Sequence, residues 1–526
     1  MSPLTGTWPL VRLVVRRDRV RLPVWMVAIL GMVYGSTAAV QEMYGTRAEL
    51  VRYDETMSSS PAVIVMSGPP TALRTLGGVT VFEINTTVLV AVALMATFLV
   101  VRHTRAEEEA GRTEMLRSAM VGRHAPTAAA LVAVGGATVA VAAGIALIML
   151  GMGLPVEGSL SYGASIAAYG LAFTATAACA AQLTGHARGA LGVGGAFLGV
   201  GFTLRAAGDV GDLALSGLSP LSWVQAVRPF ADERWWPIGL LLGFTAGMLA
   251  LAMWLTTHRD VGSGLVPART GPASASARLG TAAGLAARLQ GGALLGWAVG
   301  MFLGGIAFGS LSREVSALSA LNEDFAETLA GMGGGVVDAF RATMLLLMGL
   351  VAAGFAVSSV LRMRSEETAG RVEPLLATGL SRRRWMAGNL LVTVAGTLLV
   401  VSAGGLGMGI ADAVVQRDAG QVPRLLLSSL VYVPAALTPA ALGVLLLGWL
   451  PQVAQATWSL PAFSFVVGWL GTVLDLPAWV VEASPYTHVP LVPSQPPAWA
   501  PLLWLTAVFV VLITFGITKS SKRDIA

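Results

Sequence analysis

Long apolar stretches without a charged residue alternate with short charged segments along the whole chain. A charge at the middle of a bilayer costs about 2.5–3.5 kcal/mol on insertion scales, so each uncharged stretch predicts a transmembrane helix. In the first half, the predicted spans are residues 22–40, 84–101, 127–150, 160–183, 189–204 and 236–257. In the second half, they are residues 291–311, 342–361, 386–411, 425–449, 454–474 and 499–518. Pro451 divides the uncharged stretch 425–474 into two helices, because proline cannot continue the hydrogen-bond ladder.

The composition supports an all-α integral membrane protein with twelve transmembrane helices. Hydrophobic residues make up 55% of the 526-residue chain and charged residues 12%, against about 25% in an average soluble domain. A water-soluble fold could not cover so much apolar surface, so the solvent is a bilayer. The single cysteine, Cys179, excludes an internal disulfide, and the five scattered histidines predict no metal site.

The N-terminal region could be a signal peptide or a retained helix, and we favour the retained helix. Residues 22–40 are uncharged and form a longer run than the apolar core of a typical signal peptide. Ahead of them, residues 8–21 place apolar residues, Val11 among them, opposite three arginines at helical spacing. This pattern predicts an amphipathic helix at the inner membrane surface. A loosely ordered basic tail is the alternative.

The distribution of charges predicts that both termini lie in the cytoplasm. With that orientation, the inner segments carry 24 of the 34 lysine and arginine residues but only 10 of the 29 acidic residues. These segments are residues 1–21, 102–124, 186–188, 258–290, 362–384 and 519–526. An excess of basic residues inside favours this insertion. We therefore expect a multi-pass protein of the bacterial inner (cell) membrane.

The strongest pattern in the chain is an internal repeat. Residues Arg105–Glu114 recur as Arg364–Glu373, with seven of ten positions identical and an offset of 259 residues. A Ser-Pro pair before the sixth span and an Arg-Asp pair after it also recur. Each half has an even number of predicted spans, so the two copies run parallel, related by an axis along the membrane normal. We predict a first six-helix repeat at 1–261, a cytoplasmic linker at 262–290 and a second six-helix repeat at 291–526.

The repeated motif lies between the second and third spans of each half. Its glutamates and arginines predict i,i+4 pairs, which favour a salt-bridged helix extension in water. The predicted pairs are Glu108 with Arg112 and Glu367 with Arg371. Gly111 and Gly370 then interrupt the helix at the same point of both copies, at a cost of about 1 kcal/mol each relative to alanine. A break at matching places indicates a bend that presents a short helix, residues 112–120 or 371–378, to a cytoplasmic partner. A solvated extension without a partner is the alternative.

The motif Glu-Glu-x-x-Gly-Arg-x-Glu-x-Leu, followed by a basic cluster and the next span, resembles the permeases of ABC-2 type exporters. Taken in two ordered copies, it looks most like the fused, twelve-helix polyketide-antibiotic (tetronasin-type) exporter permeases, over nearly the whole chain. The resemblance implies that the short helix after each glycine is a coupling helix seated in a groove of an ATPase subunit. The residues implied in the first dock are Glu107, Glu108, Gly111, Arg112 and Glu114. Those implied in the second are Glu366, Glu367, Gly370, Arg371 and Glu373.

The ATPase itself is expected on another polypeptide. The chain contains no GxxxxGK[ST] phosphate loop, so it lacks the usual site of ATP hydrolysis. We expect a transport subunit that is not itself an enzyme and that holds no cofactor. Its expected partners are two copies of a P-loop ATPase subunit that binds ATP and Mg²⁺, membrane lipid, and a hydrophobic small-molecule cargo. No nucleic-acid partner is expected.

Further residues are candidates for packing or transport. Glycines at GxxxG spacing favour close helix packing in the first and seventh spans, and they are Gly31, Gly35, Gly300, Gly304 and Gly309. The aromatic residues expected along a substrate path are Trp25, Tyr34, Trp297 and Phe308. Glu83, Asp338 and Arg341 stand at outer ends of predicted spans, where boundary charges are favoured over proton carriers. Segments 219–237 and 484–501, rich in proline and tryptophan, predict an interfacial aromatic belt or, as the resemblance implies, a hairpin that helps to close the outer exit.

The leading interpretation is the membrane half of an ATP-driven exporter of antibiotics, drugs or other amphipathic or lipid-like compounds. Its two halves would rock in alternating access. The main alternative is a proton-coupled secondary transporter with twelve helices. That alternative predicts acids deep within the spans and a Gly-x-x-x-Asp-Arg-x-Gly-Arg loop, and the sequence has neither feature. A membrane scaffold without transport is a third possibility.

Overall fold

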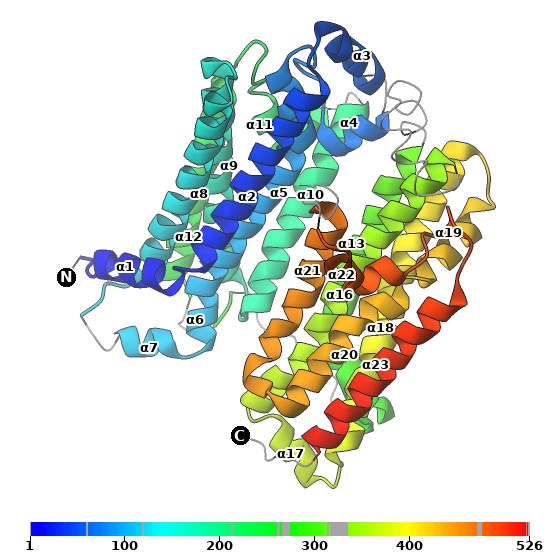
Figure 1. Cartoon of the computed structure of the whole chain (residues 1–526). Helices are drawn as coiled ribbons and strands as arrows, with labels where there is room; N and C mark the ends of the chain where they lie inside the picture. The colour runs from blue at the N-terminus through cyan, green and yellow to red at the C-terminus, as the bar shows by residue number, and fades with distance from the viewer. Residues whose placement is uncertain are drawn as a thin grey trace. The chain divides into compact units, whose positions relative to one another are not determined.

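The protein is all-α in the part of the chain that its computed structural model describes. The described residues are 2–58, 61–117, 120–211, 214–259, 263–265, 274–312, 315, 335–470, 476–521 and 523. No β-strand occurs within these ranges, and the predicted class of all-α membrane protein is confirmed. The chain divides into two compact units, unit 1 (Met1–Gly271) and unit 2 (Pro272–Ala526) (Figure 1).

Unit 1 is a bundle of long helices joined by short helices and turns (Figure 1). Its elements up to the acidic motif are α1 (Thr7–Arg17), α2 (Arg21–Met43), α3 (Arg47–Ser58), α4 (Pro61–Ser67), α5 (Leu76–His103), α6 (Arg105–Glu109) and α7 (Arg112–Arg117). The remaining elements are α8 (Ala125–Gly151), α9 (Val156–Leu183), α10 (Ala187–Gly211), η1 (Ala214–Leu218), α11 (Pro220–Gln225) and α12 (Trp236–Thr257). Helices α6 and α7 lie at one end of the unit, and α3, α4 and α11 lie toward the other (Figure 1).

The predicted amphipathic helix at the N-terminus is present as α1. Its Val11 is buried against Ala129 and Ala133 of α8, whereas Arg12 and Arg16 are exposed. The helix therefore has one apolar face on the bundle and one basic face away from it, as an amphipathic helix requires. The alternative of a loosely ordered tail is wrong.

Helices α5 and α9 form the centre of unit 1. Tyr162, Tyr169 and Phe173 of α9 are buried in an apolar cluster that includes residues of α2, α5, α8 and α12. Small residues allow this close packing, because a Cβ built on Gly170 would lie 2.9 Å from the Cβ of Thr138 in α8. Its neighbours therefore surround α9 on most sides.

One aromatic side chain anchors the segment before α12. Phe230 is buried and has a φ of 64°, a left-handed conformation that is uncommon for a residue other than glycine. Its ring fills a slot between Gly77 of α5 and Gly158 of α9. A Cβ built on Gly77 would lie 2.5 Å from the ring, and one built on Gly158 would lie 2.2 Å from it. The two glycines thus make room for the ring.

Unit 2 is a second helical bundle with a similar order of long and short elements (Figure 1). Its first elements are η2 (Ala277–Gly280), α13 (Ala282–Ser310), α16 (Val336–Thr368), α17 (Val372–Ala377), α18 (Arg382–Gln416) and α19 (Gln421–Leu430). They are followed by α20 (Val433–Trp449), η3 (Pro451–Trp458), α21 (Ser459–Leu470), α22 (Ala478–Glu482), η4 (Pro485–His488) and α23 (Trp499–Ser520).

Glycines bring α13 and α18 into backbone contact. A Cβ built on Gly305 of α13 would lie 2.1 Å from the carbonyl oxygen of Gly404 in α18. In the other direction, a Cβ built on Gly407 would lie 2.1 Å from the carbonyl oxygen of Phe302. Because only glycine fits at these positions, the small residues determine how closely the two helices approach.

The described residues contain eleven helices that are long and apolar enough to span a membrane, one fewer than predicted. The predicted span 454–474 falls on η3 and α21, and residues 471–475 lie outside the described part. The twelve-residue α21 is about 18 Å long at 1.5 Å per residue, which is shorter than a hydrocarbon core of about 30 Å. The uncharged stretch after Pro451 therefore does not begin as one continuous α-helix, because its first eight residues form the 3₁₀ helix η3.

Helix α10 is longer than its predicted span, 189–204. The prediction ended at Arg205 because a charge was taken to mark the end of a span. In the structure Arg205 is fully buried inside unit 1, with Asp209 one turn later at 3.8 Å. Its guanidinium donates hydrogen bonds to the carbonyl oxygens of Val65 and Met66 in α4, so the charge is accommodated by protein groups.

Candidate functional site: the duplicated acidic motif

In the first copy, Glu107 accepts hydrogen bonds from arginines on two short helices. Arg112 of α7 donates from both Nε and Nη2, at 2.6 and 2.9 Å. Arg17 at the end of α1 lies 3.0 Å from the same carboxylate. Burial acts to raise the pKa of the Glu107 carboxyl, but the hydrogen bonds and charges of Arg112 and Arg17 outweigh it and lower the pKa to about 2, so the pair keeps its charge at physiological pH. Glu107 therefore joins the N-terminal helix α1 to the short helix α7.

The neighbouring Glu108 pairs with an arginine that lies near the C-terminal end of unit 1 in the sequence. Arg105 donates to its carboxylate at 2.6 Å, and Arg259, just beyond α12, donates at 2.6 Å. Both arginines also donate to the carbonyl oxygen of Ser263 at 3.0 Å. Arg259 contacts Gln182 at the end of α9 as well. Glu108 thereby connects the motif after α5 to the ends of α9 and α12.

In the second copy, Glu367 has the same kind of partners. Arg382 at the start of α18 donates to Glu367 at 2.6 Å, and Arg523, just beyond α23, donates at 2.8 Å. Arg364 lies 3.6 Å away. The preceding glutamate, Glu366, is 3.3 Å from Arg371, which matches the pairing of Glu107 with Arg112.

The predicted i,i+4 pairs are wrong by one position in both copies. Arg112 binds Glu107 and not Glu108, and Arg371 binds Glu366 and not Glu367. The reason is the break at the glycine. The preceding helix has ended before the arginine, so i,i+4 spacing no longer places the two side chains together.

The predicted helix break is present in both units. Gly111 has a φ of 71° and Gly370 a φ of 67°, a left-handed conformation that glycine adopts without steric cost. The short helices α7 and α17 follow. Helix α17 is one residue shorter at each end than the predicted 371–378, and α7 is described up to Arg117, because residues 118 and 119 of the predicted 112–120 lie outside the described residues. The bend therefore depends on the glycine in each copy.

Each short helix has one buried anchor and one exposed acid. Thr113 and Val372 occupy equivalent positions and are both buried. Glu114 and Glu373, the next residues, are exposed. Of the ten predicted dock residues, the four glutamates of the two Glu-Glu pairs are thus engaged with arginines inside the units, whereas Glu114 and Glu373 present free acidic surface.

Two contacts that sequence reasoning missed hold the motif in place. Arg123 donates to the carbonyl oxygen of Thr256 at the end of α12 at 3.0 Å, and its repeat partner Arg382 donates to that of Arg523 at 2.7 Å. Cations at a helix C-terminus are favourable because of the helix dipole. In the sequence, Arg123 recurs as Arg382 and Arg259 recurs as Arg523. This recurrence could have indicated that these arginines contact the acidic motif.

The sequence analysis also did not identify Asp18 as a functional or structural residue. It lies in the turn between α1 and α2 and its side chain is almost fully buried. Arg102 at the end of α5 donates to it at 3.0 Å, and His103 contacts its other oxygen. A buried carboxylate requires such partners, so this site fixes the turn after α1 to the end of α5.

A small, mainly apolar pocket lies beside the second motif, with about 410 Å³ of empty space when its open mouth is included. Glu366 and Arg362 line it together with Leu289, Leu375 and Trp385. In unit 1 the matching glutamate, Glu107, is contacted by α1. The two motifs therefore share their ion pairs but differ in their surroundings. Within the described ranges, no cluster of three or more His, Cys, Asp or Glu side chains could hold a metal ion.

The aromatic residues predicted along a substrate path lie in both units. Trp25 of α2 stacks on Phe98 of α5 at 6.5 Å between ring centroids, and Tyr34 is exposed. Trp297 of α13 packs on Gly354 of α16, and Phe308 packs on the apolar cluster between α13, α16 and α18. Their role in a path stays a prediction.

Of the five glycines predicted to pack against other helices, one does so closely and four do not. Gly309 meets α18, because a Cβ there would lie 2.3 Å from the carbonyl oxygen of Met408. Among the described residues, nothing lies within 4 Å of a Cβ built on the other four, Gly31, Gly35, Gly300 and Gly304. Within unit 2, the close contact is made by Gly305 and Gly309.

The charges predicted at the span ends have polar partners. Arg341 of α16 donates to the buried Asp412 of α18 at 2.7 Å and to Asp338 at 2.7 Å. Glu83 of α5 accepts a hydrogen bond from the hydroxyl of Tyr53 at 3.2 Å. In unit 2, the pairing of Arg341 with Asp412 joins α16 to α18. The position of Arg341 at the end of a span did not predict this link.

Known proteins resemble this chain over its whole length. A family model described as "Multidrug efflux system permease Rv1217c, C-terminal domain" matches residues 9–255 and 279–519, and each matched segment contains one copy of the acidic motif. The chain is 38% identical, over 531 aligned positions, to the multidrug efflux system permease protein Rv1217c of Mycobacterium tuberculosis (strain ATCC 25618 / H37Rv). That alignment covers 100% of this chain and 96% of the relative.

Proposed function

This chain belongs to the family of multidrug efflux system permeases, and we propose that it is the membrane subunit of an ATP-driven exporter of the ABC-2 type. In this proposal two separate P-loop ATPase subunits dock on α7 and α17, the short helices of the acidic motifs. The ordered motifs resemble the fused, twelve-helix tetronasin-type permeases, and the proposal includes membership of that subfamily. Both termini and both motifs then lie on the cytoplasmic side of the cell membrane, in agreement with the arginine distribution.

One observation carries the proposal: each unit has the same glycine break followed by a short helix with an exposed acid. A matched pair of helices suits a matched pair of partners. Glu114 and Glu373 are the exposed side chains at the same position of α7 and α17. Because the chain has no phosphate loop, ATP and Mg²⁺ are bound by the partner, and the energy must arrive through such contacts.

The ion pairs explain how a docked partner would move the helices. Glu107 links α7 to α1, and Glu108 links the same segment to the ends of α9 and α12. In unit 2, Glu367 links the segment before α17 to α18 and to the end of α23. The pairs of Glu108 with Arg259 and of Glu367 with Arg382 are largely shielded from water and therefore costly to separate, so in this proposal a displacement of the motif is transmitted to these helices.

The cargo in this proposal is an amphipathic compound such as an antibiotic, another drug or a lipid-like molecule. Hydrophobic compounds partition into the bilayer and reach a membrane subunit from there. We propose that the substrate path is lined by aromatic side chains, because these provide large apolar contact areas. They are Trp25, Tyr34, Trp297 and Phe308.

The test is co-expression with P-loop ATPase subunits from the same host, followed by purification and measurement of ATP turnover in lipid. Glu114→Arg and Glu373→Arg should each weaken association and lower turnover, because each reverses one exposed charge at a dock. Glu482→Arg, an exposed acid before α23, is the matched control and should change neither. Failure of any ATPase to associate, together with efflux that collapses when the proton gradient is removed, would favour the secondary transporter.

A further inference from the structure

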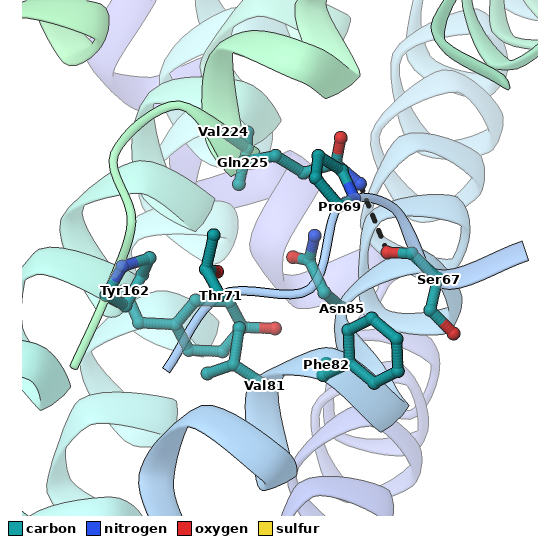
Figure 2. A pocket seen from close by; sticks show the side chains of 10 residues that line it. Ser67, Pro69, Thr71, Val81, Phe82, Asn85, Tyr162, Val224 and Gln225 are labelled. Carbon is teal, nitrogen blue, oxygen red and sulfur yellow. Dashed lines mark hydrogen bonds between the residues drawn. The ribbon is translucent and has the colours of Figure 1, made fainter. Parts of the chain in front are cut away.

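Unit 1 has a small pocket at the end of α5 that is remote from the acidic motif. Figure 2 shows it beside the segment after α4, where Gln225 of α11 donates a hydrogen bond to the carbonyl oxygen of Ser67 at 3.1 Å. Its enclosed space has room for about one water molecule, so it cannot hold a cargo molecule. The surface of unit 1 that fits a partner lies instead on α1, near the acidic motif (Figure 1).

Helix α1 is held at the end of a helix that is long and apolar enough to span a membrane. Only residues 18–20 separate Arg17, the last residue of α1, from Arg21, the first residue of the candidate span α2. Four residue steps cover at most about 14 Å, so the two helix ends are close together. Helix α1 lies crosswise to the long helices of unit 1 (Figure 1). It therefore lies where a bilayer crossed by α2 has its phosphate headgroups.

The face of α1 that points away from the bundle carries arginines and a tryptophan. Trp8, Arg12 and Arg16 follow one another at intervals of four residues, so they share this face, and all three are exposed. The guanidinium of Arg12 lies 5.9 Å from the ring centroid of Trp8. Arg19, in the turn that follows α1, is exposed as well. The side chains of these three arginines form no ion pair or hydrogen bond with a described residue.

The acidic residues near α1 do not cancel this positive charge. Asp18 is buried, and its carboxylate is contacted by Arg102 and His103. Glu107 is engaged by arginines of α1 and α7. Unit 2 differs, because the element before α13 is the four-residue η2, in which Arg278 is the one basic residue. The basic face of α1 is thus a feature of unit 1 that η2 does not repeat.

Contacts on both sides of α7 connect it to α1 and to the residues before α1. On the N-terminal side of α7, Glu107 binds the last residue of α1 at 3.0 Å and the first residue of α7 at 2.6 Å. On the C-terminal side, the backbone N–H groups of Gly122 and His124 donate to the carbonyl oxygens of residues 5 and 3, at 2.9 and 3.0 Å. Because α7 is bound to α1 at both ends, a partner that fixes α1 also restrains α7.

We propose that the exposed face of α1 binds the phosphate headgroups of anionic phospholipids and thereby restrains α7. Arginine suits phosphate because its planar guanidinium offers paired N–H donors. Trp8 and Leu13, which are 61% and 43% exposed, suit the boundary between headgroups and acyl chains, where tryptophan is enriched. An acidic protein would match the arginines, but α1 stands beside the start of a span, where lipid is the neighbour.

The proposal goes beyond ATP coupling and needs only the membrane location of the chain. Lipid binding and its effect on α7 can therefore be measured without an ATPase or nucleotide. Failure of every ATPase to associate would concern the coupling proposal alone. Failure of anionic lipid to bind α1 would concern this proposal alone.

The first experiment uses the full-length protein in nanodiscs of phosphatidylcholine and phosphatidylglycerol. Two photoreactive lipids carry the same acyl chain with a diazirine near the glycerol, one with a phosphatidylglycerol head and one with a phosphatidylcholine head. At equal mole fraction, the phosphatidylglycerol probe should label residues 7–24 at least about fivefold more, which is the contribution of one arginine near an anionic surface. Arg12→Gln/Arg16→Gln/Arg19→Gln should bring this ratio close to one. Equal labelling by both probes, or an unchanged ratio in the triple variant, would overturn the proposal.

Arg278→Gln/Arg288→Gln/Arg384→Gln is the matched control, because it removes three exposed arginines from unit 2. It should leave the labelling ratio at residues 7–24 unchanged. An equal fall in both triple variants would mean that the total charge attracts the lipid, which would contradict a site on α1. An excess of soluble glycerol phosphate should not compete, and full competition would identify free phosphate as the ligand instead. Melting temperatures confirm that both variants fold.

Hydrogen exchange tests the restraint on α7. Residues 105–117 should exchange at least about twofold more slowly in nanodiscs with phosphatidylglycerol than in phosphatidylcholine alone, because a restrained segment opens less often. The equivalent residues 364–377 of unit 2 should exchange equally in both lipids. Glu107→Gln should reduce the lipid effect on residues 105–117 while the labelling of α1 persists. A lipid effect that is absent, equal in both units, or unchanged in Glu107→Gln would show that α1 does not restrain α7.

Discussion

Arg259 donates a hydrogen bond to Glu108 at 2.6 Å, although 151 residues separate them. Arg523 donates to Glu367 at 2.8 Å across 156 residues. In each unit, an arginine two or three residues beyond the last long helix thus binds the second glutamate of the acidic motif. Because these carboxylates are largely buried, they belong to the framework of each unit and not to its exposed acidic surface.

Replacing Glu108 with glutamine should lower the free energy of unfolding by about 3 kcal/mol. The carboxylate compensates Arg105 and Arg259, whose side chains are 1% and 6% exposed, and removal of one partner of a buried ion pair is strongly destabilising. Thermal unfolding followed by tryptophan fluorescence measures the change. Glu109→Gln, at a half-exposed neighbouring position, should change stability by less than about 0.5 kcal/mol. An equal loss in both variants would contradict a special role for Glu108.

In unit 2, Arg382→Ala should destabilise the protein by about 2 kcal/mol, because Arg382 pairs with the buried Glu367 and also donates to the carbonyl oxygen of Arg523. Arg384→Ala, at an exposed position of the same helix, should have little effect. A double-mutant cycle with Glu367→Gln measures the pair directly. The double variant should lose at least about 0.5 kcal/mol less than the sum of the two single variants. Additive losses would mean that the two side chains do not interact.

Gly111→Ala and Gly370→Ala should each cost about 1–2 kcal/mol, because the left-handed conformation is unfavourable for alanine. A Cβ at either position meets nothing within 4 Å among the described residues, so the effect is one of backbone conformation alone. Asparagine tolerates this conformation better, and Gly111→Asn should recover part of the stability. Circular dichroism melts can compare the three variants. Identical melts for the alanine and asparagine variants would argue against this cause.

Gly158→Ala should destabilise unit 1 by about 1–3 kcal/mol, because the new Cβ would lie 2.2 Å from the ring of Phe230. Shortening that ring in the double variant Gly158→Ala/Phe230→Leu should restore part of the loss. Gly239→Ala, in a helix position with open space, should be neutral or stabilising by up to about 1 kcal/mol. Melting temperatures in the same detergent provide the comparison, and a neutral Gly158→Ala would show that the slot around Phe230 relaxes freely.

Much of the fold could be predicted from local patterns. The uncharged stretches identified the eleven spans of the described residues, and the basic periodicity of residues 8–21 identified α1. The repeated motif identified the glycine breaks at Gly111 and Gly370. These features depend on hydropathy, on helical periodicity and on the conformational freedom of glycine, which all act within a few neighbouring residues.

The errors occurred where distant parts of the chain meet. A charge rule ended the fifth span at Arg205, but carbonyl groups of α4 accept its hydrogen bonds. An i,i+4 rule paired Arg112 with Glu108, but the helix ends before the arginine and Glu108 is occupied by Arg259 instead. Neither partner can be inferred from spacing, because each is set by how the helices pack.

The sequence by itself determined the membrane environment, the positions of most spans, the internal repeat and the two breaks. Only the tertiary structure decided which charges are internal and which are exposed. Exposed residues, 109–112, directly follow Glu107 and Glu108 in the sequence, yet the partners of these two glutamates are Arg17 and Arg259, from the two ends of unit 1. The physical reason is that a charge shielded from water must find an opposite charge, and packing determines which one is within reach.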